Sequence, residues 1–281
     1  MRRVTAILLM AISVEAAAVA HPHAAQPAGG TSKINPKDGL TYVWIPPANF
    51  RMGCLGPVSE GSEECLGNEL PRHSITLTKG FWLGQTLVTQ NAYRRIMGKN
   101  ISAFQGDLLP VDTVSWDAAR VFCERVGMRL PTEAQWEWAS RGGIAAERYG
   151  PLDRIAWYRG NSGGATHPVR QKQPNAYGLY DMLGDVWEWV ADWYARYRQV
   201  RPCCDDPSEA TIDPQGPIMG QYHVIRGGSW NDFSADVRMS LRDHPTSPGD
   251  DEGDRDYDNY SIGFRCAADN LPPSQLRQPP L

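Results

Sequence analysis

The stretch that most constrains the fold is 175–194, NAYGLYDMLGDVWEWVADWY, which concentrates aromatic and acidic side chains in one short run. If residues 186–190 are extended, Trp187 and Trp189 point to one face and Glu188 points to the other. Buried aromatic rings can anchor a domain, and a carboxylate opposite them needs a cation, a donor or water. Oxygen-rich segments that turn at glycine suit Ca²⁺, so the sequence favours a calcium site over a plain hydrogen-bonded carboxylate at Glu188.

Residues 1–20 are predicted to be a signal peptide. Arg2 and Arg3 precede the apolar stretch Val4–Val14, and Ala18-Val19-Ala20 has the small-x-small pattern of a cleavage site. The apolar stretch is too short to be a transmembrane anchor. We therefore expect a periplasmic or secreted protein.

Composition divides the remainder into three parts. Residues 21–38 are polar with scattered proline and glycine, which predicts a flexible linker, and 271–281 form a Pro-rich tail. The folded domain is expected over 39–270.

The formal net charge is −4 and there is no basic stripe, which argues against a nucleic-acid partner. After the signal peptide, no segment of the sequence is long and apolar enough to span a membrane.

The folded part is expected to combine a few helices with short strands. Thr41–Met52 is strand-like with a Pro-Pro interruption. Helices are predicted after Thr89, Ser115 and Thr132, because each hydroxyl can cap a helix, and Thr132 with Gln135 has the form of a capping box. Beyond residue 141 the chain has short apolar runs and long loops. This pattern is typical of an irregular, loop-rich α+β domain.

Six cysteines in an exported chain make disulfides the default expectation. Cys54 and Cys65 flank a polar, Gly-containing loop that packing could not hold, which favours a bridge between them. Cys123 and Cys266 are each compatible with a buried free thiol. The adjacent pair Cys203–Cys204 has three possible roles: a vicinal disulfide, pairing with another chain, or metal binding.

Four phrases of the sequence, in order and spread over nearly the whole folded part, resemble the formylglycine-generating enzyme, or sulfatase-modifying factor, family. They are RLPTEAQWE at 129–137, NAYGLYDMLGDVWEW at 175–189, RGGSW at 226–230 and GFRCA at 263–267. The resemblance implies the family's irregular α+β fold, which is related to C-type lectins and has little regular secondary structure.

The resemblance also implies a structural calcium site and a second disulfide. The family's calcium ligands fall on Asp181, Gly184, Val186 and Glu188, of which two would act through carboxylates and two through backbone carbonyls. The disulfide of relatives falls on Cys123 and Cys266. Ca²⁺ is therefore the cofactor that we expect.

The sequence departs from the family where copper chemistry takes place. Copper-dependent members oxidise a substrate cysteine with two cysteines that follow Gly-Gly-Ser, because soft thiolates hold Cu(I). In an ungapped match these positions are Asp232 and Val237. A carboxylate and a valine cannot form a thiolate site, so we expect neither copper nor formylglycine production by the family mechanism.

The expected pocket keeps other polar and aromatic residues. Asp232 and His244 are the candidate acid–base pair. Substrate or partner binding is assigned to the side chains Ser229, Trp230, Asn231, Arg238 and Arg242. The alternative for the two arginines is that they only pair with acidic side chains of the protein itself.

Two functional hypotheses follow. In the first, the protein is an exported binding or accessory module for a peptide or protein partner, either on its own or as a structural subunit of an exported complex. In the second, it is a periplasmic enzyme for oxidative maturation of a peptide-like substrate, as in the family branch that matures pyoverdine-type siderophores. The sequence lacks a nucleotide-binding loop and a clear nucleophile–base pair, and we favour the first hypothesis.

Overall fold

A computed structural model describes residues 27–55, 65–197, 210–245 and 261–272. The predicted signal peptide, the adjacent cysteines Cys203 and Cys204, and all but the first two residues of the Pro-rich tail lie outside these ranges. Within the described ranges, no helix has the length and apolar character needed to cross a bilayer.

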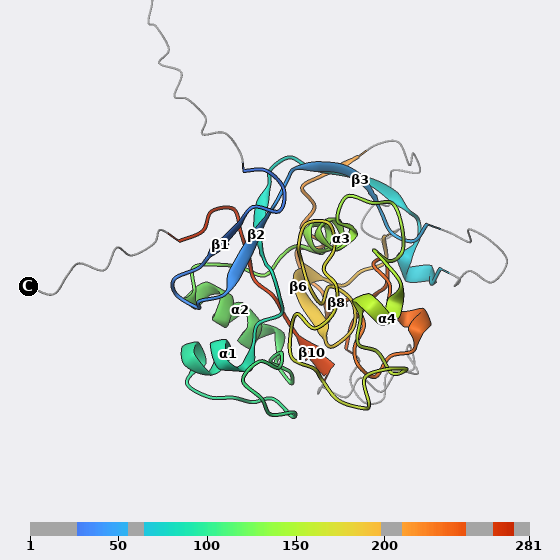
Figure 1. Ribbon diagram of the computed structural model, residues 1–281. Coiled ribbons are helices and arrows are strands. Elements are labelled where there is room, and N and C mark those ends of the chain that lie inside the picture. Colours follow the sequence, from blue (N-terminus) through green and yellow to red (C-terminus); the bar gives the residue numbers. More distant parts are fainter. Residues whose placement is uncertain (1–26, 56–64, 198–209, 246–260, 273–281) are drawn as a thin grey trace, which may run out of the picture.

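Three small sheets form the framework (Figure 1). The first has the order β1-β2-β5-β11, formed by Ser32–Ile34, Thr41–Ile45, Phe81–Gly84 and Ala267–Ala268. The second has the order β10-β6-β8-β9, formed by Ile262–Gly263, Trp187–Trp193, His223–Arg226 and Arg242–Asp243. The third has the order β3-β4-β7, formed by Ala48–Met52, His73–Leu77 and Thr211–Ile212. The Pro-Pro interruption therefore separates two strands that belong to different sheets.

The helices begin where side-chain capping predicts. Thr89, Ser115 and Thr132 each accept a hydrogen bond from the first turn, and Thr132 and Gln135 complete the capping box. The helices are α1 (Gln90–Met97), α2 (Trp116–Arg125), α3 (Glu133–Arg141) and the single turn α4 (Leu152–Ile155), with the 3₁₀ turns η1 (Gly67–Glu69) and η2 (Ser234–Asp236). Short elements joined by long loops confirm the α+β class.

The organising stretch supplies the centre of the core. Trp187 and Trp189 on β6 pack into one apolar cluster with side chains of α1 and α2, which lie next to each other in Figure 1. Val190 on the same strand joins a second cluster that contains Trp136 of α3. Strand β6 thus lies between the two halves of the core.

Both predicted disulfides are present. Cys54–Cys65 joins Cα atoms 5.8 Å apart, and Cys123–Cys266 joins Cα atoms 5.6 Å apart across 143 residues. The second bridge ties α2 to the segment between β10 and β11. Both separations are ordinary for disulfides.

The prediction of a flexible linker over 21–38 is wrong in its second half. Residues 32–34 form β1, which pairs antiparallel with β2. Asp38 is buried and accepts a hydrogen bond from the Tyr42 hydroxyl at 2.7 Å, and the Asn35 side chain donates to the Val126 carbonyl at 3.2 Å. Tertiary partners order this polar segment, and its composition alone does not reveal them.

Candidate functional site

The candidate site follows a turn at the end of β8. Gly227 and Gly228 both have positive φ, at 100° and 75°. A Cβ on Gly227 would lie 3.1 Å from both the Trp136 ring and the Met182 carbonyl oxygen. Glycine is therefore needed here both for the backbone conformation and for the close packing. The turn brings Ser229–Asp232 back over the end of β6.

Asp232 is held firmly at this turn. Its Oδ2 accepts hydrogen bonds from the Ser229 backbone N–H at 2.8 Å, the Ser229 hydroxyl at 2.6 Å and the Trp187 indole N–H at 2.8 Å. Ser229 is itself buried. Three donors on one carboxylate oxygen make Asp232 an organiser of the turn, and Ser229 belongs to the same network instead of facing a ligand.

Val237, the second family thiol position, lies fully buried in the core. An apolar side chain there and a carboxylate at Asp232 leave both positions without a sulfur ligand. Hard carboxylate oxygens bind Cu(I) poorly. That the chain does not use copper stays a prediction.

The accessible part of the site is aromatic. Trp230 packs edge-to-face on Phe104 with ring centroids 5.4 Å apart. Phe233 is 60% exposed, and the guanidinium of exposed Arg159 lies 4.6 Å from its ring centroid. Asn231 is exposed between Trp230 and Phe233. We call these five residues the aromatic surface.

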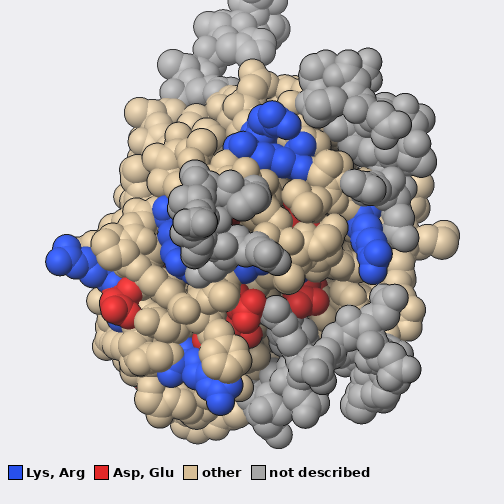
Figure 2. All heavy atoms as spheres, turned by 90° about the vertical axis from the view of Figure 1, so that its right-hand side faces the viewer, with Lys and Arg blue, Asp and Glu red and all other residues tan. Residues whose placement is uncertain are grey.

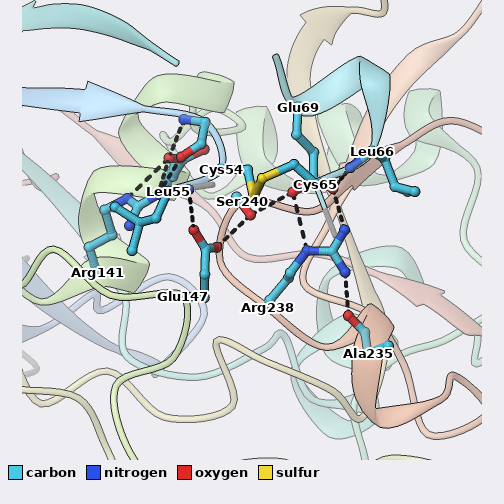
Figure 3. Close-up of a disulfide and its surroundings, with 12 residues drawn as sticks. Cys54, Leu55, Cys65, Leu66, Glu69, Arg141, Glu147, Ala235, Arg238 and Ser240 are labelled. Atoms are coloured by element: carbon cyan, nitrogen blue, oxygen red, sulfur yellow. Dashed lines mark hydrogen bonds and ion pairs between the residues drawn. A yellow bond between two sulfur atoms is a disulfide. The ribbon is translucent and has the colours of Figure 1, made fainter. Parts of the chain in front are cut away.

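Arg238 and Arg242 do not face a ligand, which corrects their assignment to substrate binding. Arg238 pairs with buried Glu69 next to the Cys54–Cys65 disulfide, as Figure 3 shows. Arg242 makes two hydrogen bonds to Glu133, at 2.7 and 2.8 Å. Both guanidiniums are almost fully buried, so the alternative of internal pairing is confirmed.

The network around Arg238 joins the disulfide to the turn. In Figure 3 the Ser240 hydroxyl lies between the carboxylates of Glu69 and Glu147. Glu147 also accepts a hydrogen bond from the Leu55 backbone N–H at 2.7 Å. These contacts connect Arg238 and Ser240, in the turn after η2, to Glu69 on η1 and, through Glu147, to Leu55 beside Cys54.

Asp232 and His244 are not brought together, which does not support the expected acid–base pair. His244 follows β9 and packs against Tyr194 and Tyr222, with ring centroids 4.2 and 4.7 Å away. Because β9 runs antiparallel to β8, His244 lies at the opposite end of β8 from the Ser229–Asp232 turn. General acid–base catalysis requires both groups within reach of one substrate.

Glu188 has a cation partner within the protein. Arg265 donates to both of its oxygens, at 2.7 and 2.8 Å, and also to the carbonyls of Gly84, Tyr180 and Asp181. This partner belongs to the GFRCA phrase, 77 residues from Glu188 in the sequence.

The four expected calcium ligands, Asp181, Gly184, Val186 and Glu188, are all buried around the start of β6. The Asp181 carboxylate accepts a hydrogen bond from the Arg170 backbone N–H at 2.8 Å, and Gly184 turns the chain with φ 72°. The Arg265 guanidinium, however, would bring a positive charge beside an ion bound by Glu188. Calcium at Asp181, Gly184, Val186 and Glu188 stays a prediction, and the ion would share Glu188 with Arg265.

Further buried ion pairs, which the sequence motifs did not predict, lie around α3. Glu137 pairs with Arg141 one turn along α3 and with Arg226 on β8, and all three side chains are almost fully buried. Burial raises the pKa of Glu137, but the two guanidiniums outweigh this effect, so the pKa is lowered overall. The four-residue spacing of Glu137 and Arg141 is the signal that could have revealed one of these pairs.

The charged surface shows no preference for one sign of partner. On the face in Figure 2, the described lysines and arginines form several separate groups with acidic side chains between them. A single basic stripe is absent from this face among the described residues. The aromatic surface is thus the more distinctive feature.

Comparisons with known proteins agree with the motifs. A family model described as the sulfatase-modifying factor enzyme 1-like domain matches residues 30–270. A Chlamydia pneumoniae protein named serine/threonine-protein kinase pkn1 is 36% identical over 239 residues, covering 75% of this chain and 36% of that protein. The formylglycine-generating enzyme of Mus musculus is 32% identical over 220 residues, covering 71% of this chain and 54% of that enzyme.

A solved structure, PvdO from Pseudomonas aeruginosa, superposes with a TM-score of 0.68 and 25% identity, covering 86% of this chain and 99% of that one. The chain spans about half or less of the length of the two curated relatives, so the match describes a shared domain. From the matched range, the four motifs and the irregular α+β fold, we conclude that this chain belongs to the formylglycine-generating enzyme, or sulfatase-modifying factor, family and has its C-type-lectin-like fold.

Proposed function

We propose that this protein is an exported binding or accessory module of the formylglycine-generating enzyme family, which recognises a peptide or protein partner without copper-dependent cysteine oxidation. One observation carries the proposal. At the two positions that would hold copper, Asp232 is engaged by three donors and Val237 is buried in the core. Neither supplies a soft ligand.

The aromatic surface supports recognition of a partner. Exposed aromatic side chains such as Phe233 supply contact area with few rotatable bonds, and aromatic and arginine side chains dominate the energetics of many interfaces. Arg159 beside Phe233 adds a cation at the edge of this area. The partner that fits best is a peptide segment with an apolar side chain next to an acidic one.

The two disulfides support the exported location. Cytosolic thiols are kept reduced, whereas the periplasm and the exterior allow bridges such as Cys54–Cys65 and Cys123–Cys266 to persist. The predicted signal peptide is consistent with this location. A complex with other exported proteins is part of the same proposal.

Site-specific photo-crosslinking in the native host tests the binding role. A photoreactive amino acid is placed at residue 231, and a control is placed at residue 124, whose Glu side chain on α2 is also exposed. We expect a discrete adduct at position 231 only, which is lost when Phe233→Ala is added. No adduct at position 231, or the same adducts at both positions, would overturn the proposal.

A further inference from the structure

Asp185 lies where several buried polar groups have no hydrogen-bond partner. Its backbone N–H donates to the Trp157 carbonyl at 2.8 Å, and its carbonyl accepts from the Trp230 backbone N–H at 2.9 Å. Its side-chain Oδ1 accepts from the His167 backbone N–H at 2.9 Å. Its other oxygen, Oδ2, has no partner. Atoms of three neighbouring residues are also unpartnered, namely Thr166 Oγ1, Trp157 Nε1 and Trp230 Nε1.

Asp112 reaches the same region from the loop before α2. Its Oδ1 accepts from the Ala103 N–H at 2.6 Å and from the Thr113 hydroxyl at 2.7 Å, whereas its Oδ2 has no partner. The neighbouring residues Val111 and Val186 meet at Gly263, where a Cβ would lie 2.5 Å from the Val111 carbonyl and 2.9 Å from the Val186 side chain. The loop of Asp112 is therefore adjacent to the loop of Asp185.

A second contact connects the two loops. Phe104, next to the Ala103 that donates to Asp112, packs on Trp230, and the backbone N–H of Trp230 donates to Asp185. The loops of Asp112 and Asp185, which are more than 70 residues apart in the sequence, are thus connected by two independent contacts. Both carboxylates are inaccessible to solvent, with Asp112 at 0% and Asp185 at 1% exposure.

The charge in this region is not compensated by the protein. Within the described part of the chain, no ion pair involves Asp112 or Asp185. Buried carboxylates without a partner are costly, so the group requires a proton or a cation.

We propose that Asp112 and Asp185 hold one hard divalent cation, with the Thr166 hydroxyl as a third protein ligand and Ca²⁺ as the best-fitting ion. The oxygens of these three side chains that lack a hydrogen-bond partner are all hard ligands, which select calcium over copper or zinc. Water molecules would complete the coordination, since calcium takes six to eight oxygens. This set is distinct from Asp181, Gly184, Val186 and Glu188.

Calcium binding to the purified full chain tests the site through two readouts. One is the melting temperature with calcium and with chelator, because an ion that binds only the native state stabilises it by mass action. The other is luminescence of Tb³⁺ excited through tryptophan, since Trp157 and Trp230 flank Asp185. We expect saturable binding by the wild-type chain in both experiments.

The isosteric variants Asp185→Asn and Asp112→Asn are each expected to weaken binding at least about tenfold, because each removes a charged ligand. With chelator present, Asp185→Asn should melt no lower than the wild type, since the variant removes an uncompensated buried charge. The matched control is Asp181→Asn, which changes a buried carboxylate outside the proposed set and should keep the calcium response.

Retention of the response by both Asp185→Asn and Asp112→Asn would overturn the proposal. So would the reverse pattern, in which Asp181→Asn alone abolishes it, because that result would assign the ion to the Asp181–Glu188 set. Failure of the wild-type chain to bind either Ca²⁺ or Tb³⁺ would show that protonation alone satisfies Asp185. Either aspartate variant suffices for the test if the other fails to fold.

Discussion

The buried glutamates and the buried aspartates of this domain are compensated in opposite ways. Glu69, Glu133, Glu137 and Glu188 each pair with a buried arginine. The equally buried carboxylates of Asp112, Asp181 and Asp185 accept hydrogen bonds only from backbone N–H groups and one hydroxyl, without an ion pair among the described residues. The carboxylates of the first group are each paired with a cation of the protein, whereas no ion pair of the described residues involves the second group.

The comparison explains what the family motifs do in this chain. Glu137 of RLPTEAQWE pairs with Arg226 of RGGSW, and Glu188 of NAYGLYDMLGDVWEW pairs with Arg265 of GFRCA. The motif residues are therefore one another's partners across 89 and 77 residues. In this chain these four motif positions stabilise the fold through their buried ion pairs.

The largest expected effect comes from breaking a completed pair. Glu137→Gln leaves Arg141 and Arg226 without their anion, and removing one partner of a buried ion pair destabilises by about 3–5 kcal/mol. Urea denaturation measures the change in the free energy of unfolding. The control Glu124→Gln removes an exposed partner of Arg120 and should change the free energy of unfolding by less than about 1 kcal/mol. Equal losses of unfolding free energy in Glu137→Gln and Glu124→Gln would contradict the view that buried ion pairs matter more than exposed ones.

Asp192 is an intermediate case, because its carboxylate accepts a hydrogen bond from the Glu133 backbone N–H at 2.8 Å but also lies beside the Glu133 carboxylate. Burial raises the pKa of Asp192 to about 7, and the Glu133 charge contributes to this shift. The folded state therefore holds a proton that the unfolded state has lost, so wild-type stability should fall as pH rises from about 4 to about 7.

Asp192→Asn should remove this loss, which amounts to at most about 4 kcal/mol. Denaturation of the variant and the wild type at several pH values measures the difference between them. The free energy of unfolding of the variant should rise relative to that of the wild type as pH rises from about 4 to about 7. A difference that does not vary with pH would show that Asp192 is not a proton-binding site of the folded state.

The smallest expected effect is at the surface. Arg94→Met removes an exposed pair with Asp107, whose atoms are 2.9 Å apart. Water screens this pair, so the free energy of unfolding should change by less than about 1 kcal/mol. Thermal or urea denaturation at two salt concentrations checks this expectation. A loss of unfolding free energy as large as that of Glu137→Gln would show that burial does not determine how much these ion pairs contribute to stability.

Local features of the fold could be predicted from the sequence, and long-range partners could not. The capping box of Thr132 and Gln135 and the Cys54–Cys65 bridge depend on neighbouring residues, and both are confirmed. Composition made 32–38 look like a linker, because the contact of Asp38 with Tyr42 is a property of the folded sheet.

The candidate site shows the same limit. Arg238 and Arg242 were assigned to a ligand because their positions follow Gly-Gly-Ser, but their carboxylate partners, Glu69 and Glu133, lie more than 100 residues earlier. No local pattern reveals such a pair. The loss of both thiol positions, in contrast, is a matter of residue identity, and the sequence was sufficient to establish it.

The most direct measurement of the central claim is turnover of a thiol substrate. Copper-loaded protein is incubated with a Cys-x-Pro-x-Arg peptide, and loss of the peptide thiol is followed. Because Asp232 and Val237 supply no thiolate, we predict no turnover. Copper-dependent conversion of the cysteine to an aldehyde would contradict the account, and variants of Cys203 and Cys204 would then identify the missing ligands.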